Sequence, residues 1–254
     1  MPSPRLQSEL LIAHALGLPR LQLYLQFERE LSATELEQLR GLVRRRASRE
    51  PIQHITGSTG FSGLSLLCGK AALVPRPETE ILVEHAIRIL IDVGTGSGAI
   101  PLALARKHPQ HRYLGLDLSP EALALARQNT THVPSAPPEG TSVDWRENDL
   151  LVGLAEKALL ITANLPYLTP QEIEGAEPEV RHDPKLALDG GKNGLDLIRR
   201  LIPQAMQLTS TLLLECGSSQ TETVAELTRS AGFTRAIIHP DLTSRPRFVE
   251  ATLV

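Results

Sequence analysis

The chain has 254 residues, of which 41% are hydrophobic and 22% charged, so it can form one large domain or two unequal ones around a substantial core. Its formal net charge of −3 argues against a duplex DNA binder, because such a protein needs a strongly cationic surface. No stretch is long and apolar enough to span a bilayer, and the N-terminus has no signal-peptide pattern. We therefore expect a soluble, cytoplasmic protein with no membrane contact.

The two cysteines, Cys68 and Cys216, lie far apart in the sequence and form no C-x-x-C pair. This pattern does not indicate a metal site, and we predict that no metal is bound. The simpler interpretation is two buried or half-buried free thiols in a reducing compartment.

Residues 1–50 have the apolar spacing of helices. Gly17 is typical of a helix end, and Ser32 with Glu35 predicts a capping box at the start of a second helix. The polar face of this second helix carries arginines at Arg40, Arg44, Arg45, Arg46 and Arg49. We favour a solvated helix face; the alternative is a basic patch that binds an acidic partner such as RNA or the ribosome.

Residues 51–74 are rich in glycine, serine and threonine, with short apolar stretches at 64–67 and 71–74. This pattern predicts a β-hairpin that links two domains. Pro77 then stands where a helix can begin, since the first turn does not need its missing N–H. We expect that helix over residues 78–88.

From residue 89 onward, apolar strand patterns alternate with helical ones. The predicted strands are Ile89–Val93, Tyr113–Asp117, Val143–Arg146, Leu159–Ala163, Thr211–Cys216, Ala236–His239 and Phe248–Val254. The predicted helices are Ala99–Lys107, Pro120–Asn129, Leu195–Leu208 and Thr221–Ala231. Seven strands with intervening helices indicate an α/β fold with a doubly wound sheet, which binds ligands at the carboxyl ends of its strands.

A glycine-rich turn follows the first of these strands and consists of Gly94, Thr95, Gly96, Ser97 and Gly98. Glycine permits positive φ and close approach of a ligand, and the free N–H groups of the helix that begins at Ala99 face the same side. Asp117 ends the next strand, where an acid binds ribose hydroxyls. The alternative role of Asp117 is to cap the helix that begins at Pro120, although Ser119 is the better placed N-cap. The turn also fits the dinucleotide fingerprint, so a nicotinamide-dependent oxidoreductase is a second hypothesis.

Asn148, Asp149 and Leu150 follow the third strand. A polar group at this position can accept a hydrogen bond from an adenine amine, and Leu150 can pack on the ring. A plain turn is the alternative interpretation.

The fourth strand ends in Asn164-Leu165-Pro166-Tyr167. The side-chain oxygen of Asn164 and the backbone carbonyl of Leu165 can hold the two N–H bonds of a planar NH₂ group. Pro166 stiffens the turn, and Tyr167 offers an aromatic wall that can also contact a sulfonium. Together with the glycine-rich turn, this segment indicates methyl transfer from S-adenosylmethionine to an amide or a base amine. The alternative is a strand-end turn without a catalytic role.

Several segments, in this order, resemble the HemK/PrmC family of protein-glutamine N5-methyltransferases. They are P-I-Q-H-I-T-G (51–57), P-R-P-E-T-E (75–80), D-V-G-T-G-S-G-A-I (92–100), D-L-S-P-E-A-L (117–123), N-L-P-Y-L (164–168), E-P-E-V (177–180), A-L-D-G-G-K-N-G-L-D (187–196), L-L-L-E-C-G (212–217) and D-L-T-S-R-P-R (241–247).

The resemblance implies a helical substrate-docking domain at 1–50, a hairpin linker at 51–74 and a Rossmann-like class I methyltransferase domain at 75–254. It implies transfer of a methyl group from S-adenosylmethionine, leaving S-adenosylhomocysteine, to the glutamine of the Gly-Gly-Gln loop in class 1 peptide chain release factors. By matching position, Gly94–Gly98 and Asp117 would hold the cofactor, and Asn164 would border its methyl group. We add Asp149 and Leu150 to the cofactor site from the interpretation of the turn after the third strand. Asn164–Tyr167 and Arg76 would hold the substrate, and we expect a monomer.

The chain departs from the family pattern at two places. Leu165 stands where family members commonly have proline, which leaves the backbone carbonyl in place and predicts a looser turn. His182-Asp183-Pro184 replaces the usual Glu-Pro. Because N-L-P-Y also resembles rRNA adenine dimethyltransferases, an RNA adenine N6-methyltransferase is an alternative, as is a non-catalytic binding module.

Overall fold

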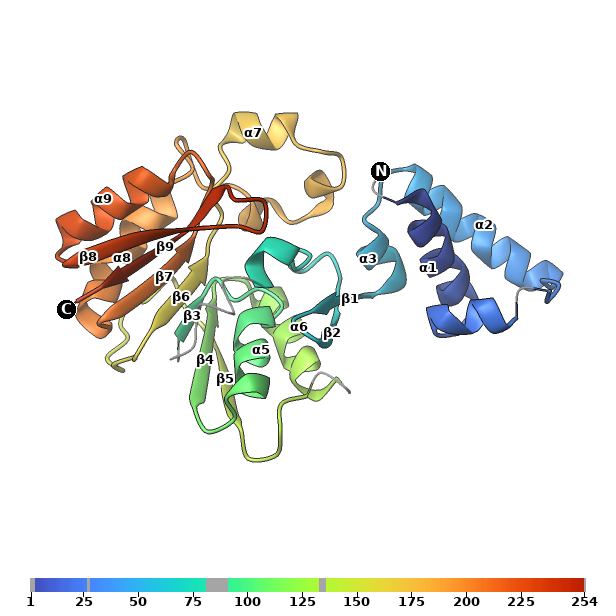
Figure 1. Cartoon of the computed structure of the whole chain (residues 1–254), viewed down its shortest axis with the longest axis horizontal. Helices are drawn as coiled ribbons and strands as arrows, with labels where there is room; N and C mark the ends of the chain where they lie inside the picture. The colour runs from blue at the N-terminus through green and yellow to red at the C-terminus, as the bar shows by residue number, and fades with distance from the viewer. Residues whose placement is uncertain (1–2, 27, 81–90, 133–135, 254) are drawn as a thin grey trace.

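The computed structural model describes residues 3–26, 28–80, 91–132 and 136–253. Its N-terminal part is helical, as predicted. The elements are α1 (Pro4–Leu16), the 3₁₀ helix η1 (Arg20–Leu25), α2 (Ala33–Ala47) and α3 (Ile52–Thr56). Gly17 ends α1 with a φ of 62°, and Ser32 and Glu35 form the predicted capping box of α2. Figure 1 shows α1 and α2 as a lobe beside the rest of the molecule.

The linker is only partly the predicted hairpin. Its first residues form α3, and the hairpin pairs β1 (Ser58–Phe61) with β2 (Leu64–Leu67). Ser62 and Gly63 both have positive φ, of 45° and 78°, which is the two-residue turn that matches strand twist. Because this turn closes the hairpin locally, the apolar residues 71–74 have no strand to pair with and form irregular chain, contrary to the prediction.

The remaining strands form one seven-stranded sheet in the order β5-β4-β3-β6-β7-β9-β8. Their bounds are β3 (Ile91–Val93), β4 (Arg112–Asp117), β5 (Ser142–Glu147), β6 (Ile161–Asn164), β7 (Thr211–Glu215), β8 (Arg235–Pro240) and β9 (Pro246–Thr252). The strands from β5 to β7 are parallel, and β9 runs antiparallel to both β7 and β8. The predicted α/β sheet of seven strands is confirmed.

The helices between the strands are also those predicted, with short additions. They are α5 (Ala99–Lys107), α6 (Pro120–Thr131), α8 (Asp196–Leu208) and α9 (Thr221–Ala231). Three short helices lie between β6 and α8, namely α7 (Pro170–Gly175), η2 (Val180–His182) and η3 (Lys185–Ala187). Residues 77–80 are helical, whereas the rest of the predicted 78–88 helix and strand residues 89–90 lie outside the described residues.

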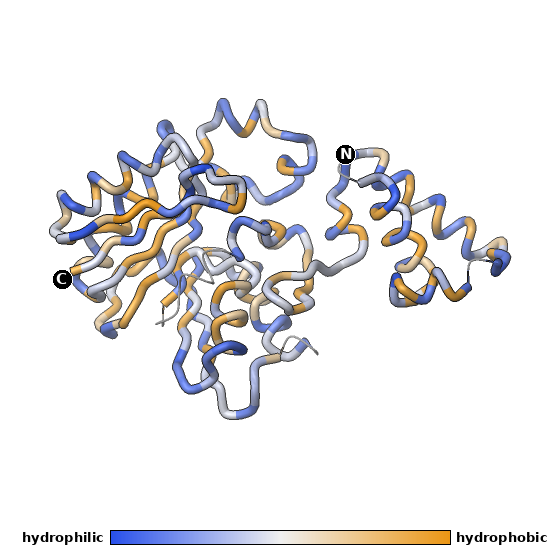
Figure 2. The backbone as a smooth tube through the Cα atoms, in the orientation of Figure 1, coloured by the Kyte–Doolittle hydropathy of each residue, from blue (hydrophilic) through white to orange (hydrophobic). Residues whose placement is uncertain are grey.

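Hydrophobic side chains cover both faces of the sheet. In β7, Leu212 and Leu214 join the core formed with α8 and α9, while Leu213 joins the core formed with α5 and the hairpin. Alternation of this kind requires a strand that is apolar at successive positions, as in parallel sheets covered on both sides. Figure 2 shows the hydrophobic residues concentrated along these strands.

The helical lobe contacts the sheet domain through an ion pair. The guanidinium of Arg46, on α2, donates to Glu179 over 2.9 Å, and Arg49 lies 3.2 Å from the same carboxylate. Arg46 is buried, so the prediction of a solvated arginine face is wrong at this residue. The reason is that α2 packs its last turn toward the segment that leads into η2. Among the described residues, no helix has the length and apolar character needed to cross a membrane.

Candidate active site

A cavity of about 250 Å³ lies at the carboxyl ends of β3, β4 and β6. This is where a doubly wound sheet binds its ligands. The predicted site residues that line the cavity are Arg76, Gly94, Thr95, Gly96, Ser97, Asp117, Asp149, Leu150, Asn164, Leu165 and Pro166. Gly98 and Tyr167 are not among its lining residues.

The glycine-rich turn needs its glycines for two different reasons. Gly94, Gly96 and Gly98 all have positive φ, of 71°, 56° and 79°. A Cβ at Gly94 would lie 2.8 Å from the Leu165 side chain, and one at Gly98 would lie 2.5 Å from the Trp145 ring. A Cβ at Gly96 would meet nothing closer than 3.9 Å. Gly94 and Gly98 therefore permit packing inside the protein, whereas Gly96 leaves room on the cavity side.

Asp117 holds this turn in place. Its Oδ2 atom accepts a hydrogen bond from the backbone N–H of Gly96 over 2.8 Å, and its Oδ1 atom accepts one from Ser119 over 2.9 Å. Burial raises the pKa of Asp117, and these backbone hydrogen bonds oppose that rise. Helix α6 is capped by Ser119, so Asp117 is not its cap. The adjacent Leu118 also lines the cavity with an exposed side chain, which sequence reasoning missed.

The turn after β5 lines the cavity and is also held by hydrogen bonds within itself. The side-chain amide of Asn148 donates to the carbonyls of Leu150 and Val152, and Leu150 has a φ of 53°. Asp149 forms an ion pair with Arg200 over 2.6 Å. All three predicted residues line the cavity, but the amide of Asn148 is engaged within the turn itself.

Asn164 ends β6 with its side-chain amide at the cavity. Its Nδ2 atom donates to the hydroxyl of Thr79 over 3.0 Å. Within the described part of the chain, no group donates a hydrogen bond to Oδ1 of Asn164 or to the carbonyl oxygen of Leu165. Two residues that line the cavity therefore each have an acceptor oxygen that receives no hydrogen bond from the described residues. The side chain of Leu165 is buried against Gly94, so the turn is packed rather than loose.

Thr79, which accepts the hydrogen bond from Asn164, is itself bonded to a buried carboxylate. The hydroxyl of Thr79 donates to Oε2 of Glu215 over 3.0 Å. Thr79 is 6% exposed and Glu215 3%. Burial raises the pKa of Glu215 to about 7, against the opposing effects of the Thr79 hydrogen bond and Arg247. Sequence reasoning missed both residues, although Thr79 and Glu215 stand inside the motifs P-R-P-E-T-E and L-L-L-E-C-G.

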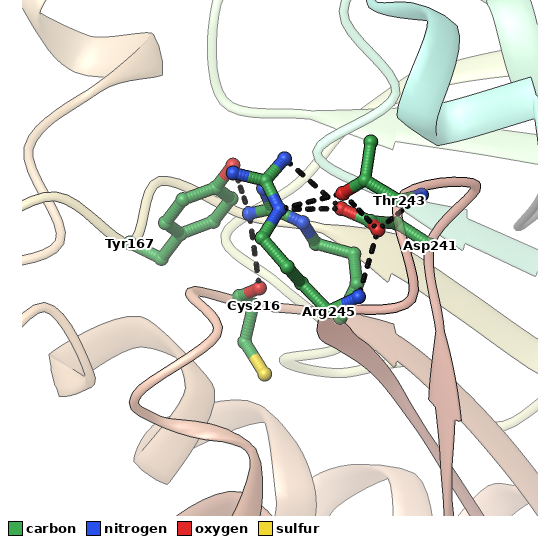
Figure 3. A network of polar contacts seen from close by, with 6 residues as sticks. Tyr167, Cys216, Asp241, Thr243 and Arg245 are labelled. Carbon is green, nitrogen blue, oxygen red and sulfur yellow. Dashed lines mark hydrogen bonds and ion pairs between the residues drawn. The ribbon is translucent and has the colours of Figure 1, made fainter.

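We had expected Tyr167 to form an aromatic wall of the site, but it does not line the cavity. Its hydroxyl accepts a hydrogen bond from Arg247 over 3.3 Å, and the Arg247 guanidinium carbon is 5.9 Å from the ring centroid. The same guanidinium donates to the backbone carbonyl of Cys216 over 3.3 Å, and Figure 3 shows Tyr167 and Cys216 in one view with the Asp241–Arg245 turn. The ring contacts this arginine because β9 runs alongside β7, a pairing that the local sequence does not reveal.

Two glycines bring the segment before α8 against the Asn164–Tyr167 backbone. A Cβ at Gly190 would lie 2.7 Å from the carbonyl oxygen of Pro166, and one at Gly194 would lie 2.1 Å from that of Tyr167. The amide of Gln220 also donates to the Tyr167 carbonyl over 2.9 Å. These contacts hold the turn and explain two of the three glycines of the 187–196 motif.

Arg76 pairs with a buried acid rather than standing free. It donates to Oδ2 of Asp183 over 2.7 Å, and His54 lies 3.9 Å from the other oxygen of that carboxylate. Burial raises the pKa of Asp183, and Arg76 opposes that rise. Asp183 thus has a definite role, joining the linker and the residues before Pro77 to the segment after β6.

Comparison with known proteins places this geometry in a family. The family model of the PrmC N-terminal domain matches residues 1–57, and that of a methyltransferase domain matches residues 90–181. A release factor glutamine methyltransferase of Deinococcus radiodurans is 41% identical over 262 residues, covering 99% of this chain and 92% of that protein. The chain belongs to the release factor glutamine methyltransferase family. The release factor glutamine methyltransferase of Geobacter sulfurreducens is 40% identical. Its alignment covers 90% of this chain and 82% of that protein.

Solved structures agree with the fold of this release factor glutamine methyltransferase family member. A methyltransferase from Pyrococcus furiosus superposes with a TM-score of 0.55 at 14% identity, covering 85% of this chain and 97% of that one. Similarity at this level of identity concerns the fold alone. Membership of the family makes the chain an enzyme of the methyltransferase class.

Proposed function

We propose that this protein transfers a methyl group from S-adenosylmethionine to the side-chain amide nitrogen of the glutamine in the Gly-Gly-Gln loop of class 1 peptide chain release factors. One observation carries the proposal: Asn164 and Leu165 both line the cavity, and each has an acceptor oxygen that receives no hydrogen bond from the described residues. The names of the curated relatives point to the same reaction.

The cavity suits the cofactor by its chemistry. Gly96 leaves open backbone for the methionine portion, and the first turn of α5 has N–H groups without a side-chain cap. Thr95 and Ser97 of the same turn also line the cavity. Asp117 would hold ribose hydroxyls, and Leu118 and Leu150 would pack on the adenine. When bound, the cofactor supplies an electrophilic methyl group on a sulfonium.

The protein's task is then to present a poor nucleophile in the right orientation. The lone pair of an amide nitrogen is delocalised into its carbonyl. Asn164 Oδ1 and the Leu165 carbonyl would each accept one N–H of the glutamine, which turns the lone pair toward the methyl group. Such positioning supplies most of the catalysis without a general base. Removing one oriented polar group of this kind costs about 10²–10³ in rate.

The helical lobe has a separate proposed role in binding the whole release factor. Leu21 and Leu25 on η1 are 72% and 84% exposed, and Tyr24 on the same short helix is also exposed, so η1 presents several neighbouring large apolar side chains to solvent. Arg44 and Arg45, in contrast, are paired with Glu37 and Glu50 of the same lobe. We therefore assign docking to the apolar residues of η1 rather than to the arginines.

RNA adenine methylation is the second candidate because Leu165 makes the tetrapeptide N-L-P-Y. A nicotinamide oxidoreductase would leave the two acceptor oxygens without a role. The test is mass spectrometry after incubation with isotopically labelled S-adenosylmethionine, with a release factor and an RNA as parallel substrates. We expect one labelled methyl group on the Gly-Gly-Gln glutamine and none on a Gly-Gly-Glu variant. Label on RNA adenine alone would reject the proposal.

A further inference from the structure

The orientation of the Asn164 amide decides whether the cavity meets an acceptor or a donor. An asparagine amide has an oxygen and a nitrogen of similar size, and its neighbours determine which one points where. The glutamine NH₂ group needs the oxygen. A flipped Asn164 would present its own N–H groups to those of the substrate, and no hydrogen bond could form.

Thr79 and Glu215 impose a direction on this amide. Glu215 accepts at Oε2 from the Thr79 hydroxyl, and that hydroxyl has one proton. With its proton directed at Glu215, the Thr79 oxygen can only accept from Asn164, which it does from Nδ2 over 3.0 Å. Oδ1 of Asn164 is then the atom left for a ligand.

Protonation of the carboxyl group removes this constraint. A neutral Glu215 can donate to Thr79, and the threonine proton is then free to turn toward Asn164. That arrangement suits a flipped amide with its oxygen at Thr79. The ionised form of Glu215 therefore selects the orientation that the reaction needs, and the neutral form permits both.

We propose that Thr79 and Glu215 are positioning residues that act through Asn164, holding its amide oxygen toward the nitrogen that receives the methyl group. The inference rests on the proposed function for its consequence in catalysis. The hydrogen-bond direction itself is a property of the folded protein and can be measured without any reaction.

The surroundings of Glu215 bring its pKa into the neutral range. Glu78 faces it from the helix that begins at Pro77, Arg247 from β9, and Tyr167 and Cys216 from adjoining turns. Glu78 raises the pKa of Glu215 and Arg247 lowers it, but burial has the largest effect and brings the value to about 7. The constraint on Asn164 should accordingly strengthen as pH rises through about 7.

The experiment compares single-turnover methyl transfer at saturating cofactor in the wild type, Thr79→Val, Thr79→Ser and Glu215→Gln, from pH 6 to 8.5. Loss of the hydroxyl in Thr79→Val should lower the rate by about 10–100-fold, the cost of losing one oriented hydrogen bond. Thr79→Ser keeps the hydroxyl and should stay within about 3-fold of the wild type. Affinity for S-adenosylmethionine, measured by calorimetry, should be the same in all four proteins.

The pH profile of the rate distinguishes an effect on the orientation of the Asn164 amide from a general effect of the substitutions on core packing. Glu215→Gln retains an acceptor oxygen but has no charge to lose, so the rise in rate near pH 7 should disappear. Thr162→Val is the matched control, because Thr162 is a buried threonine on β6 that donates to the buried Asp92 over 2.7 Å and does not bond Asn164. This variant should keep the wild-type inflection. A Thr79→Val rate within 2-fold of wild type, a Thr79→Ser variant as slow as Thr79→Val, or an unchanged inflection in Glu215→Gln would each overturn the inference.

A second measurement keeps the test valid if the proposed substrate is wrong. The Asn164 side-chain NH₂ signals in a ¹⁵N-correlated NMR spectrum, assigned with Asn164→Ala, should report a hydrogen bond at high pH that Thr79→Val removes. Absence of methylation by the wild type would reject the proposed function alone. Identical Asn164 signals in wild type and Thr79→Val would reject the positioning role alone.

Discussion

The side-chain amide of Asn164 donates a hydrogen bond to the hydroxyl of Thr79, which lies 85 residues earlier in the chain. This contact joins the end of β6 to the helix that begins at Pro77. It ties the segment that would bind the substrate glutamine to a residue in the wall of the proposed cofactor cavity, so the two proposed sites are joined by a direct contact.

The catalytic contribution of Leu165 should come from its backbone. Its side chain is buried against Gly94 and does not act on the substrate in our account. Leu165→Ala should therefore lower the free energy of unfolding by about 2–5 kcal/mol, as for other buried leucines, and leave the single-turnover rate within a few-fold of wild type. Denaturant unfolding and quench-flow kinetics measure the two quantities. A rate loss much larger than this, with unchanged cofactor affinity, would show that the side chain itself takes part.

Asp117 should act on cofactor binding rather than on methyl transfer. Asp117→Ala removes both the proposed ribose contact and the hydrogen bond to Gly96. Loss of a hydrogen bond to a charged group costs about 1.5–3 kcal/mol, so the dissociation constant for S-adenosylmethionine should rise at least 10-fold. Asp117→Asn is the matched control, since it retains an oxygen for Gly96 and should weaken binding less. Equal affinity of Asp117→Ala and wild type in calorimetry would refute the assignment.

Two buried carboxyl groups should make the folded protein less stable as pH rises toward neutrality. Burial raises the pKa of Asp92 and of Glu215 to about 7, from ordinary values of 3.8 and 4.5. The folded state thus binds more protons than the unfolded state between about pH 4.5 and 7, and the free energy of unfolding falls as pH rises through this window. Each group contributes a slope of up to about 1.4 kcal/mol per pH unit.

Urea unfolding at pH 5, 6 and 7 measures this dependence. Glu215→Gln should reduce the slope, because it removes one of the carboxyl groups whose pKa is raised by burial, a set that also includes Asp117 and Asp183. Glu9 and Asp241 do not interfere, since their lowered pKa values place their own effects below this pH window. A free energy of unfolding that rises with pH between 5 and 7 would contradict the assigned pKa shifts. So would a pH dependence that Glu215→Gln leaves unchanged.

The exposed leucines of η1 should matter for a whole release factor and not for a fragment of it. Leu25→Asp, or the same change at Leu21, places a charge on the proposed docking surface without disturbing the core. We expect kcat/KM for the intact release factor to fall about 10-fold, a typical cost for one interface side chain, and that for a short Gly-Gly-Gln peptide to stay the same. Leu242→Asp, on the exposed turn between β8 and β9, controls for any surface leucine. An equal loss on both substrates would argue against docking.

The sequence predicted the sheet and the position of the glycine-rich turn at the end of β3 well because both depend on local patterns. Apolar strand residues, Gly94–Gly98 and Ser119 as the α6 cap each act within a few residues of their own position. The position of Asn164 at the cavity was predicted in the same way, since it is the last residue of β6.

The rest of the site could not be predicted because it depends on contacts between distant segments. Glu215 resembles an ordinary strand-end acid until the fold places it 3.0 Å from Thr79, 136 residues away. The same holds for Tyr167, whose ring contacts Arg247, and for Arg76, which pairs with Asp183. The hairpin limits were missed for a local reason, since the Ser62-Gly63 turn has the two positive φ angles usually supplied by Asn-Gly.

The most direct test of the account is the single-turnover rate of methyl transfer to a Gly-Gly-Gln substrate by Asn164→Ala, measured at saturating S-adenosylmethionine. If the Asn164 oxygen orients the accepting nitrogen, the rate should fall about 10²–10³-fold while the affinity for the cofactor is retained. A rate close to that of the wild type would contradict the central claim.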